Sequence, residues 1–303
     1  MTSLLTRRSS LCGGVALGVT PSAFAQRFAW PHGAVAAVSL SYDDGLDSQI
    51  AYAAPALDSA GLKATFFLTK DNVGPTLGDW RRVARSGHEI GDHTVSHPCA
   101  IGGYSSGRFA RDELLPMEDW LDLNFGRSGP RVFAYPCSVT DLGPGNATEQ
   151  RARYEALLRT IGFRAARTCD GDAPNTLSHV RTHPYRLRAS AVTYEVDEPT
   201  PAMEYVRQAM EMGGWAILVF HEIKPEPTVG GDTSVATHDA VLGWLKSEPV
   251  WCAPIGTVLG AIEANKDGPA QGARSPSRRW PASPPSGKLI TSGSHWRGSP
   301  SMG

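Results

Sequence analysis

Short apolar runs alternate with longer amphipathic segments between residues 35 and 263. The apolar runs have the length and the β-branched and aromatic content of buried strands. We predict seven strands and a shorter eighth run, at 35–41, 64–69, 88–93, 131–136, 163–168, 179–183, 215–221 and 250–254. Helical spacing of apolar residues predicts helices between them, at 47–61, 108–126, 147–162, 201–214 and 237–247.

Strands that alternate with helices are typical of a parallel sheet, because parallel neighbours are joined by a crossover that is usually a helix. About seven such units within roughly 230 residues favour a sheet closed into a barrel. We therefore predict an α/β fold, a distorted (β/α) barrel of about seven parallel strands that forms a single domain over residues 30–264. In such a barrel the chemistry lies at the C-terminal ends of the strands.

The two ends of the chain differ in composition from its middle. The pair Arg7 and Arg8, an apolar stretch at 11–19 and the pattern Ala23-Phe24-Ala25 are together typical of a twin-arginine export signal. We expect residues 1–25 to be this signal peptide and the protein to reach the bacterial periplasm or the extracellular space. The stretch 265–303 is rich in Pro, Ser, Gly and Arg, so we expect a disordered tail there.

The charge of the chain and its cysteine content bear on its binding partners and on possible disulfides. The 29 basic and 30 acidic residues nearly balance, which speaks against a nucleic-acid partner, and no apolar run is long enough for a transmembrane segment. The oligomeric state stays open. Four cysteines follow the expected signal peptide: Cys99, Cys137, Cys169 and Cys252. An oxidising compartment would permit disulfides among them, but their spacing does not select a pairing.

Adjacent acids stand where the first predicted strand stops, in the stretch Tyr42-Asp43-Asp44-Gly45. Neighbouring side chains of a strand point to opposite faces, so two adjacent acids can serve one site only where the chain turns. Gly45 would permit that turn. The plain alternative is a strand-ending turn with no chemistry, because Asp and Gly favour turns for local reasons.

Histidines follow two other predicted strands. His93 and His97 are four residues apart, a spacing that places both on one side of a helical turn, and His221 follows the strand at 215–221. Two histidines and one carboxylate can hold zinc and leave a position open for water, whose pKa the ion lowers to about 7. A second acid beside them could then take the proton. A helix start over a packed histidine is the simpler interpretation of the pair.

Four motifs in order, SLSYDDG, HEIGDHTVSH, FAYPCS and ILVFHE, resemble those of the polysaccharide deacetylases, the NodB-homology group called carbohydrate esterase family four. The resemblance extends from Val35 to Glu222. It implies a distorted barrel of β/α units and a hydrolase that removes acetyl groups from polysaccharides. It also implies a divalent metal, with zinc as the first choice and Co²⁺, Ni²⁺ or Mn²⁺ as alternatives.

The resemblance also assigns roles to residues. It implies that Asp43 is the general base and that His221 protonates the leaving group. The main-chain N–H of Cys137, which follows Tyr135 and Pro136 in the third motif, would help to hold the oxyanion. The implied metal ligands are Asp44, His93 and His97.

Two positions depart from the family pattern. Ala134 stands where many members carry the arginine that orients the base, and Arg131 and Arg167 are candidates to replace it. The acidic partner of the proton-donating histidine has no clear counterpart. Asp170 or Asp172 could serve, although either is also typical of a surface turn.

Three functions remain in view. The leading one is a metal-dependent hydrolase that removes acetyl groups from an N- or O-acetylated polysaccharide or oligosaccharide. The second is hydrolysis of a small non-sugar amide at the same site. The third is a secreted glycan-binding protein whose catalysis has lapsed, which the two departures favour and the complete set of acids and histidines opposes.

Overall fold

A computed structural model describes residues 28–191, 197–228 and 230–265. The expected signal peptide, and the expected tail beyond Asn265, lie outside these residues. Within the described part, no helix is long and apolar enough to cross a membrane.

Seven parallel strands form the central sheet, in the order β5-β4-β3-β2-β1-β6 with β9 also paired to β1. The strands are β1 (Ala36–Tyr42), β2 (Thr65–Leu68), β3 (Glu89–Asp92), β4 (Val132–Ala134), β5 (Ala165–Arg167), β6 (Trp215–Phe220) and β9 (Val250–Cys252). Because β6 pairs along 37–42 of β1, the other edge of β1 takes β2 near its C-terminus and β9 near its N-terminus. This fork distorts the barrel.

The segment 187–190 joins the two outer strands of the sheet. The N–H of Leu187 donates to Ala166 O (2.9 Å) beside β5, and the N–H of Ser190 donates to Ile217 O (2.9 Å) in β6. Isolated bridges pair the same segment with Arg167 and with Leu218. The strands together with this segment therefore confirm the predicted distorted (β/α) barrel.

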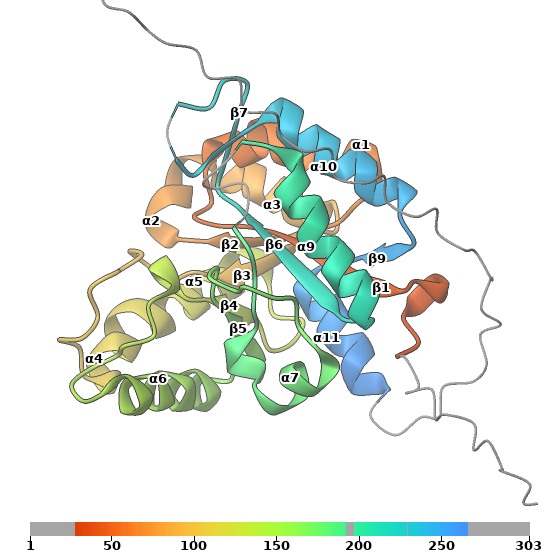
Figure 1. The fold of residues 1–303 in the computed structure, drawn as a ribbon. Helices are drawn as coiled ribbons and strands as arrows, with labels where there is room; N and C mark the ends of the chain where they lie inside the picture. Colours follow the sequence, from red (N-terminus) through yellow and green to blue (C-terminus); the bar gives the residue numbers. More distant parts are fainter. Residues whose placement is uncertain (1–27, 192–196, 229, 266–303) are drawn as a thin grey trace, which may run out of the picture. The chain divides into compact units, whose positions relative to one another are not determined.

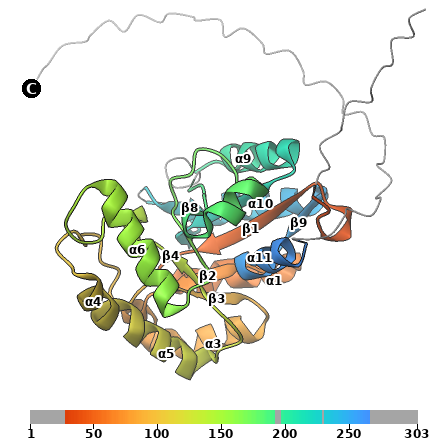
Figure 2. The same cartoon turned by 90° about the horizontal axis from the view of Figure 1, so that it is seen from below.

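Helices lie around the outside of the strands (Figures 1 and 2). They are α1 (Ala54–Ala60), α2 (Lys70–Val73), α3 (Leu77–Arg85), α4 (Ser106–Phe109), α5 (Leu115–Phe125), α6 (Ala147–Ile161), α7 (Leu177–Thr182), α9 (Pro199–Met212), α10 (Val235–Ser247) and α11 (Ile255–Ala264). A second sheet pairs β7 (Glu222–Lys224) with β8 (Asp232–Ser234) in parallel. All five predicted helices are present, two of them preceded by a turn of π-helix, at Gln49–Ala53 and Ala110–Leu114.

One predicted strand is wrong. Residues 179–183 belong to α7 and its C-terminal cap, because the Thr176 side chain accepts a hydrogen bond from His179 N (3.1 Å) and starts a helix there. Three helices, α2, α3 and α11, lie where no element was predicted. The N-terminus of α11 is held by tertiary contacts, since Gly256 N donates to Glu89 (3.0 Å) and Ile255 N donates to Thr65 Oγ1 (2.9 Å).

The barrel interior is one apolar cluster with members from five strands: Ala37, Phe67, Ala134, Ala165 and Ile217 among others. All seven residues of β1 are buried, as expected for a strand with barrel on one face and helices on the other. Asp43 continues the alternate positions of Ala37, so its carboxylate follows the inward row of side chains. The Asp43 carboxylate therefore lies at the C-terminal end of the apolar barrel interior.

Candidate functional site

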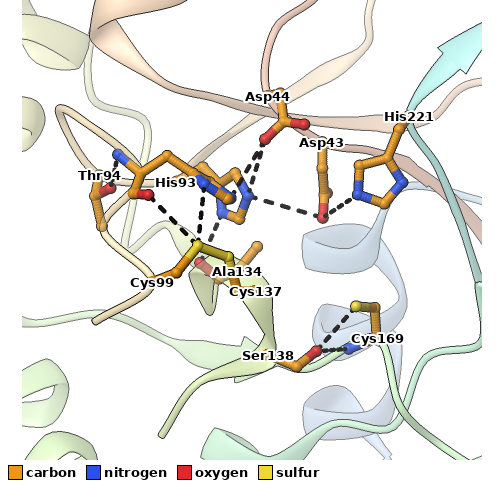
Figure 3. The surroundings of a disulfide bond; sticks show 11 residues. Asp43, Asp44, His93, Thr94, Cys99, Ala134, Cys137, Ser138, Cys169 and His221 are labelled. Carbon is orange, nitrogen blue, oxygen red and sulfur yellow. Dashed lines mark hydrogen bonds and ion pairs between the residues drawn. A yellow bond between two sulfur atoms is a disulfide. The ribbon is translucent and has the colours of Figure 1, made fainter. Parts of the chain in front are cut away.

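The adjacent acids follow β1 directly, and both face one site (Figure 3). Asp43 is 2% exposed, and its N–H donates to Phe220 O (3.0 Å) as though the strand continued. Asp44 has a left-handed backbone with φ 77°, which turns its side chain out of the strand's alternation. The sequence allowed a strand-ending turn without chemistry as the simpler interpretation. The turn is present, and it is what lets two neighbouring carboxylates reach one crevice.

A candidate metal centre combines Asp44 with two histidines. One ligand atom from each of Asp44, His93 and His97 lies within 4.8 Å of the others. Asp44 Oδ1 is 3.5 Å from His93 Nε2 and 3.4 Å from His97 Nε2. His93 Nδ1 lies 2.9 Å from Ala134 O, and because a carbonyl only accepts, this contact leaves the Nε2 lone pair free for a metal. The donor set fits zinc or a similar divalent ion.

The two histidines lie on a loop, so the predicted helical turn is wrong. The chain after β3 forms bends, with positive φ at Thr94 (72°) and His97 (55°). Asp92 Oδ1 accepts from Thr94 N (2.7 Å), and Glu113 accepts from Ser96 N (2.9 Å). These contacts fold the loop so that the imidazole centroids lie 4.6 Å apart.

The histidines also set the charge of Asp44. Burial would raise the pKa of Asp44, but the hydrogen bond to His93 and the charges of His93, His221 and His97 outweigh it and lower the pKa to about 2. Burial, and then the nearby His93, lowers the pKa of His97. An ionised carboxylate and a neutral imidazole are the forms that bind a metal.

Asp43 makes an ion pair with Arg167. The Arg167 guanidinium is fully buried at the end of β5, bonds Asp43 Oδ1 through Nη2, and lies 4.6 Å above the Phe67 ring. Asp43 Oδ2 faces the site, 3.9 Å from His93 Nε2 and 4.0 Å from His221 Nε2. Arg167 therefore occupies one carboxylate oxygen and leaves the other toward the crevice.

Gln49 fixes two main-chain positions of the site. Its Nε2 donates to Asp43 O (2.5 Å) and to His221 O (3.0 Å), so one buried amide links the end of β1 to the end of β6. Gln49 was not among the predicted site residues. Its only signal was a polar side chain in a predicted amphipathic helix, which is ordinary.

A disulfide joins the loop of the histidines to the third motif. Cys99 and Cys137 are bonded, with Cα atoms 5.6 Å apart, while Cys169 and Cys252 are free thiols. Cys137 and Ser138 both have positive φ, 53° and 56°. Ser138 Oγ accepts from Cys169 N (2.8 Å), which fixes the turn (Figure 3).

The other predicted residues divide between the crevice and the surrounding structure. Tyr135 is nearly buried, and its hydroxyl donates to Tyr185 O (3.1 Å). Pro136 begins the turn that carries Cys137. Arg131 pairs instead with Glu118 (3.0 Å) and Asp122 (2.6 Å), so of the two candidate arginines it is Arg167 that contacts Asp43.

A crevice of about 790 Å³ opens over these groups. Asp170 and Asp172 are exposed residues of its lining, so each has access to the site, and the role of either as a partner of His221 stays a prediction. The remaining lining consists of Asp43, Asp44, His93, His97, Tyr135, Cys137, Cys169, Gly171, Ser190, Ala191 and His221. The crevice thus brings acids, imidazoles and a turn together at the carboxyl ends of the strands, an arrangement in which general acid and base groups could flank a reacting group.

Replacing Gly45 by alanine is expected to lower the free energy of unfolding by about 3 kcal/mol. The left-handed backbone conformation costs a residue with a Cβ about 1–2 kcal/mol, and the steric clash of that Cβ costs about 1–2 kcal/mol more. Gly45 has φ 71°, and an added Cβ would lie 2.7 Å from Val73 Cγ2. Gly61 is the matched control, because it has φ 70° with no atom within 4 Å of the added Cβ, so Gly61→Ala has only the backbone cost. Urea unfolding of both variants measures the difference, and equal losses would contradict the clash.

The chain matches one protein-family model and is similar in sequence to two curated proteins described below. Residues 32–151 match the model described as polysaccharide deacetylase. An uncharacterized protein of Streptomyces coelicolor is 28% identical over 165 residues, 54% of this chain and 61% of that protein. A peptidoglycan-N-acetylglucosamine deacetylase of Bacillus cereus is 38% identical over 78 residues, 25% of this chain and 27% of that protein. The chain therefore spans less than two thirds of either relative.

A solved structure supports the fold. A protein of Mycobacterium smegmatis classed with the polysaccharide deacetylases aligns with a TM-score of 0.59 at 19% identity, over 83% of this chain and 98% of that one. At 19% identity this similarity supports the fold only.

Proposed function

Because the chain belongs to the polysaccharide deacetylase family, we propose that it is a metal-dependent hydrolase that removes acetyl groups from an N- or O-acetylated carbohydrate. The observation that carries the proposal is the grouping of Asp44, His93 and His97 beside a second carboxylate that a buried arginine restrains. A structural role alone would not require two neighbouring acids and three histidines to meet at the mouth of a barrel.

Asp44, His93 and His97 would hold the metal. A divalent ion bound there supplies Lewis acidity, which polarises the acetyl carbonyl and lowers the pKa of water. The protein contributes an ionised carboxylate, a histidine whose tautomer Ala134 O fixes, and a crevice of about 790 Å³.

Asp43 acts as the general base. Arg167 engages its Oδ1, which leaves Oδ2 as the oxygen available to accept a proton. Its Oδ2 points into the crevice beside His93, where the attacking water must lie to reach a carbonyl held at the metal ligands. The base therefore takes the proton of the water as the new C–O bond forms.

His221 and Cys137 act on the other atoms of the reacting group. The main-chain N–H of Cys137 helps to hold the oxyanion that develops on the acetyl oxygen. His221, which lies across Asp43 from His93, donates a proton to the departing amine or alkoxide. The products are acetate and the free amino or hydroxyl group.

Acetate release is the test of this function. The protein is stripped with a chelator, reloaded with Zn²⁺, Co²⁺, Ni²⁺ or Mn²⁺, and assayed on N-acetylglucosamine oligomers, acetyl-xylan and small acetylated amides. Stripping is expected to lower activity by at least about 10²-fold and reloading to restore it, because several kcal/mol of Lewis-acid stabilisation are lost and regained.

The substrate panel separates the proposed function from its competitors. Turnover of a saccharide but not of the small amides supports the carbohydrate deacetylase. Turnover of the small amides alone would favour the second enzyme. Saturable oligosaccharide binding by the metal-loaded protein without acetate release would show a glycan-binding protein instead.

A further inference from the structure

A second group of metal-ligand side chains shares His97 with the candidate metal centre. One ligand atom from each of His97, Cys99 and Cys137 lies within 4.8 Å of the others. The two sulfur atoms are joined as a disulfide and so are not ligands in this state. Figure 3 shows the disulfide beside Asp44 and His93.

The two nitrogens of His97 face different groups. Nε2 lies 3.4 Å from Asp44 Oδ1, whereas Nδ1 lies 3.8 Å from Cys99 Sγ. A neutral imidazole has one lone pair, carried by only one of its nitrogens at a time. His93 differs, because Ala134 O holds its Nδ1 and only Nε2 remains for a metal. His97 can therefore serve either group, while His93 serves one.

The loops that carry the sulfur atoms have anchors of their own. His97 N donates to Thr94 Oγ1 (3.0 Å), and Ser96 Oγ donates to Glu113 (2.7 Å). On the other side, Val139 N donates to Pro136 O (2.9 Å), next to the bond between Ser138 and Cys169. These contacts keep Cys99 and Cys137 near each other after the S–S bond opens. Both cysteines are exposed, so a reductant can reach them.

We propose that reduction of the Cys99–Cys137 disulfide creates a second metal site, with ligands Cys99, Cys137 and His97 Nδ1, for a thiophilic divalent cation such as Zn²⁺ or Cd²⁺. The site competes with Asp44 and His93 for His97, so reduction withdraws one ligand from the centre used by the proposed function. Thiolates favour soft ions, and three protein ligands leave a fourth tetrahedral position for water.

The reaction balances with a phosphine as the reductant. The phosphine gives two electrons to the S–S bond, water supplies two protons to the sulfurs and its oxygen to the phosphine, and the products are two thiols and a phosphine oxide. Metal binding then displaces the two thiol protons. A chain exported with the signal expected at residues 1–25 would pass from a reducing to an oxidising compartment, and so through both states.

Cobalt spectroscopy tests the proposal without any turnover. Co²⁺ is titrated into the oxidised full-length protein and into protein reduced with a water-soluble phosphine, and metal content is measured by equilibrium dialysis. Reduction is expected to produce a thiolate-to-Co²⁺ charge-transfer band in the near ultraviolet that the oxidised protein lacks. The stoichiometry should stay at one tightly bound ion per chain, because the two sites share His97.

Variants assign the band to the proposed sulfurs. Reduced Cys99→Ser should retain about half of the band or less, since one of two thiolates is gone. Reduced Cys252→Ser is the matched control and should keep the whole band, because Cys252 lies in β9 and outside the group.

Two results would overturn the proposal. Identical Co²⁺ spectra before and after reduction would show that no thiolate site forms, and two tightly bound ions per reduced chain would show that the sites do not compete. Neither depends on deacetylation, whereas the proposed function is tested on the metal-loaded oxidised protein and fails if that protein releases no acetate from any saccharide of the panel.

Discussion

Replacing Asp43 by asparagine is expected to lower kcat by about 10³-fold while the metal stays bound, because general base catalysis contributes about 10²–10⁴-fold. Asparagine has nearly the size of aspartate, but its amide does not accept a proton from water. The ligands Asp44, His93 and His97 are unchanged, so metal affinity should be largely retained. Kinetics on the best substrate of the panel, with metal analysis of the same sample, measure both effects.

Stability must be followed in the same variant. The loss of the Asp43 charge leaves the fully buried Arg167 without its carboxylate, and breaking a buried pair costs about 3–5 kcal/mol. Thermal unfolding therefore accompanies the kinetics, and activity is expressed per folded protein. Asp47→Asn is the matched control, because Asp47 is exposed four residues further on and should leave kcat unchanged. Wild-type activity in folded Asp43→Asn would contradict the role of the base.

Replacing Arg167 by methionine is expected to lower kcat by about 10²-fold with a much smaller change in KM, since misplacement of a catalytic group by about 1 Å costs a factor of that size. In the proposed mechanism Arg167 is a positioning residue that acts through Asp43 Oδ1, and it does not line the crevice. The free energy of unfolding should fall by about 3 kcal/mol, because a buried carboxylate is left unpaired. Steady-state kinetics and urea unfolding test the two effects separately.

The double variant Asp43→Asn/Arg167→Met separates charge pairing from packing. Removing both charges should cost less stability than the sum of the single losses, because neither charge is then buried alone. Arg131→Met is the control for the loss of a buried arginine, since Arg131 pairs with Glu118 and Asp122 away from the base. It should lower stability and leave kcat near the wild-type value. An equal fall of kcat in both arginine variants would show a general structural effect.

The local pattern of apolar and polar residues was sufficient to predict most of the strands and helices. The strands at 35–41 and 215–221 appear as β1 and β6 within one residue at each end, because a run of apolar and β-branched residues is buried on both faces of a parallel strand. The prediction failed at 179–183, where Thr176 caps a helix. It also missed α11, whose first N–H groups depend on Glu89 and Thr65, residues more than 160 positions away in the chain.

Motif order alone was enough to assign Asp43, Asp44, His93, His97 and His221 to one site. The contacts that hold these residues could be seen only once the strands and loops were in place. Ala134 stands where the motif comparison led us to expect an arginine, and Arg167 of the neighbouring strand β5 makes the ion pair with Asp43 instead. The pairing of Cys99 with Cys137 was likewise one of three choices until the loops were placed. Both contacts join residues far apart in sequence, and they form because the parallel sheet places the C-terminal ends of different strands, and the loops that follow them, next to one another.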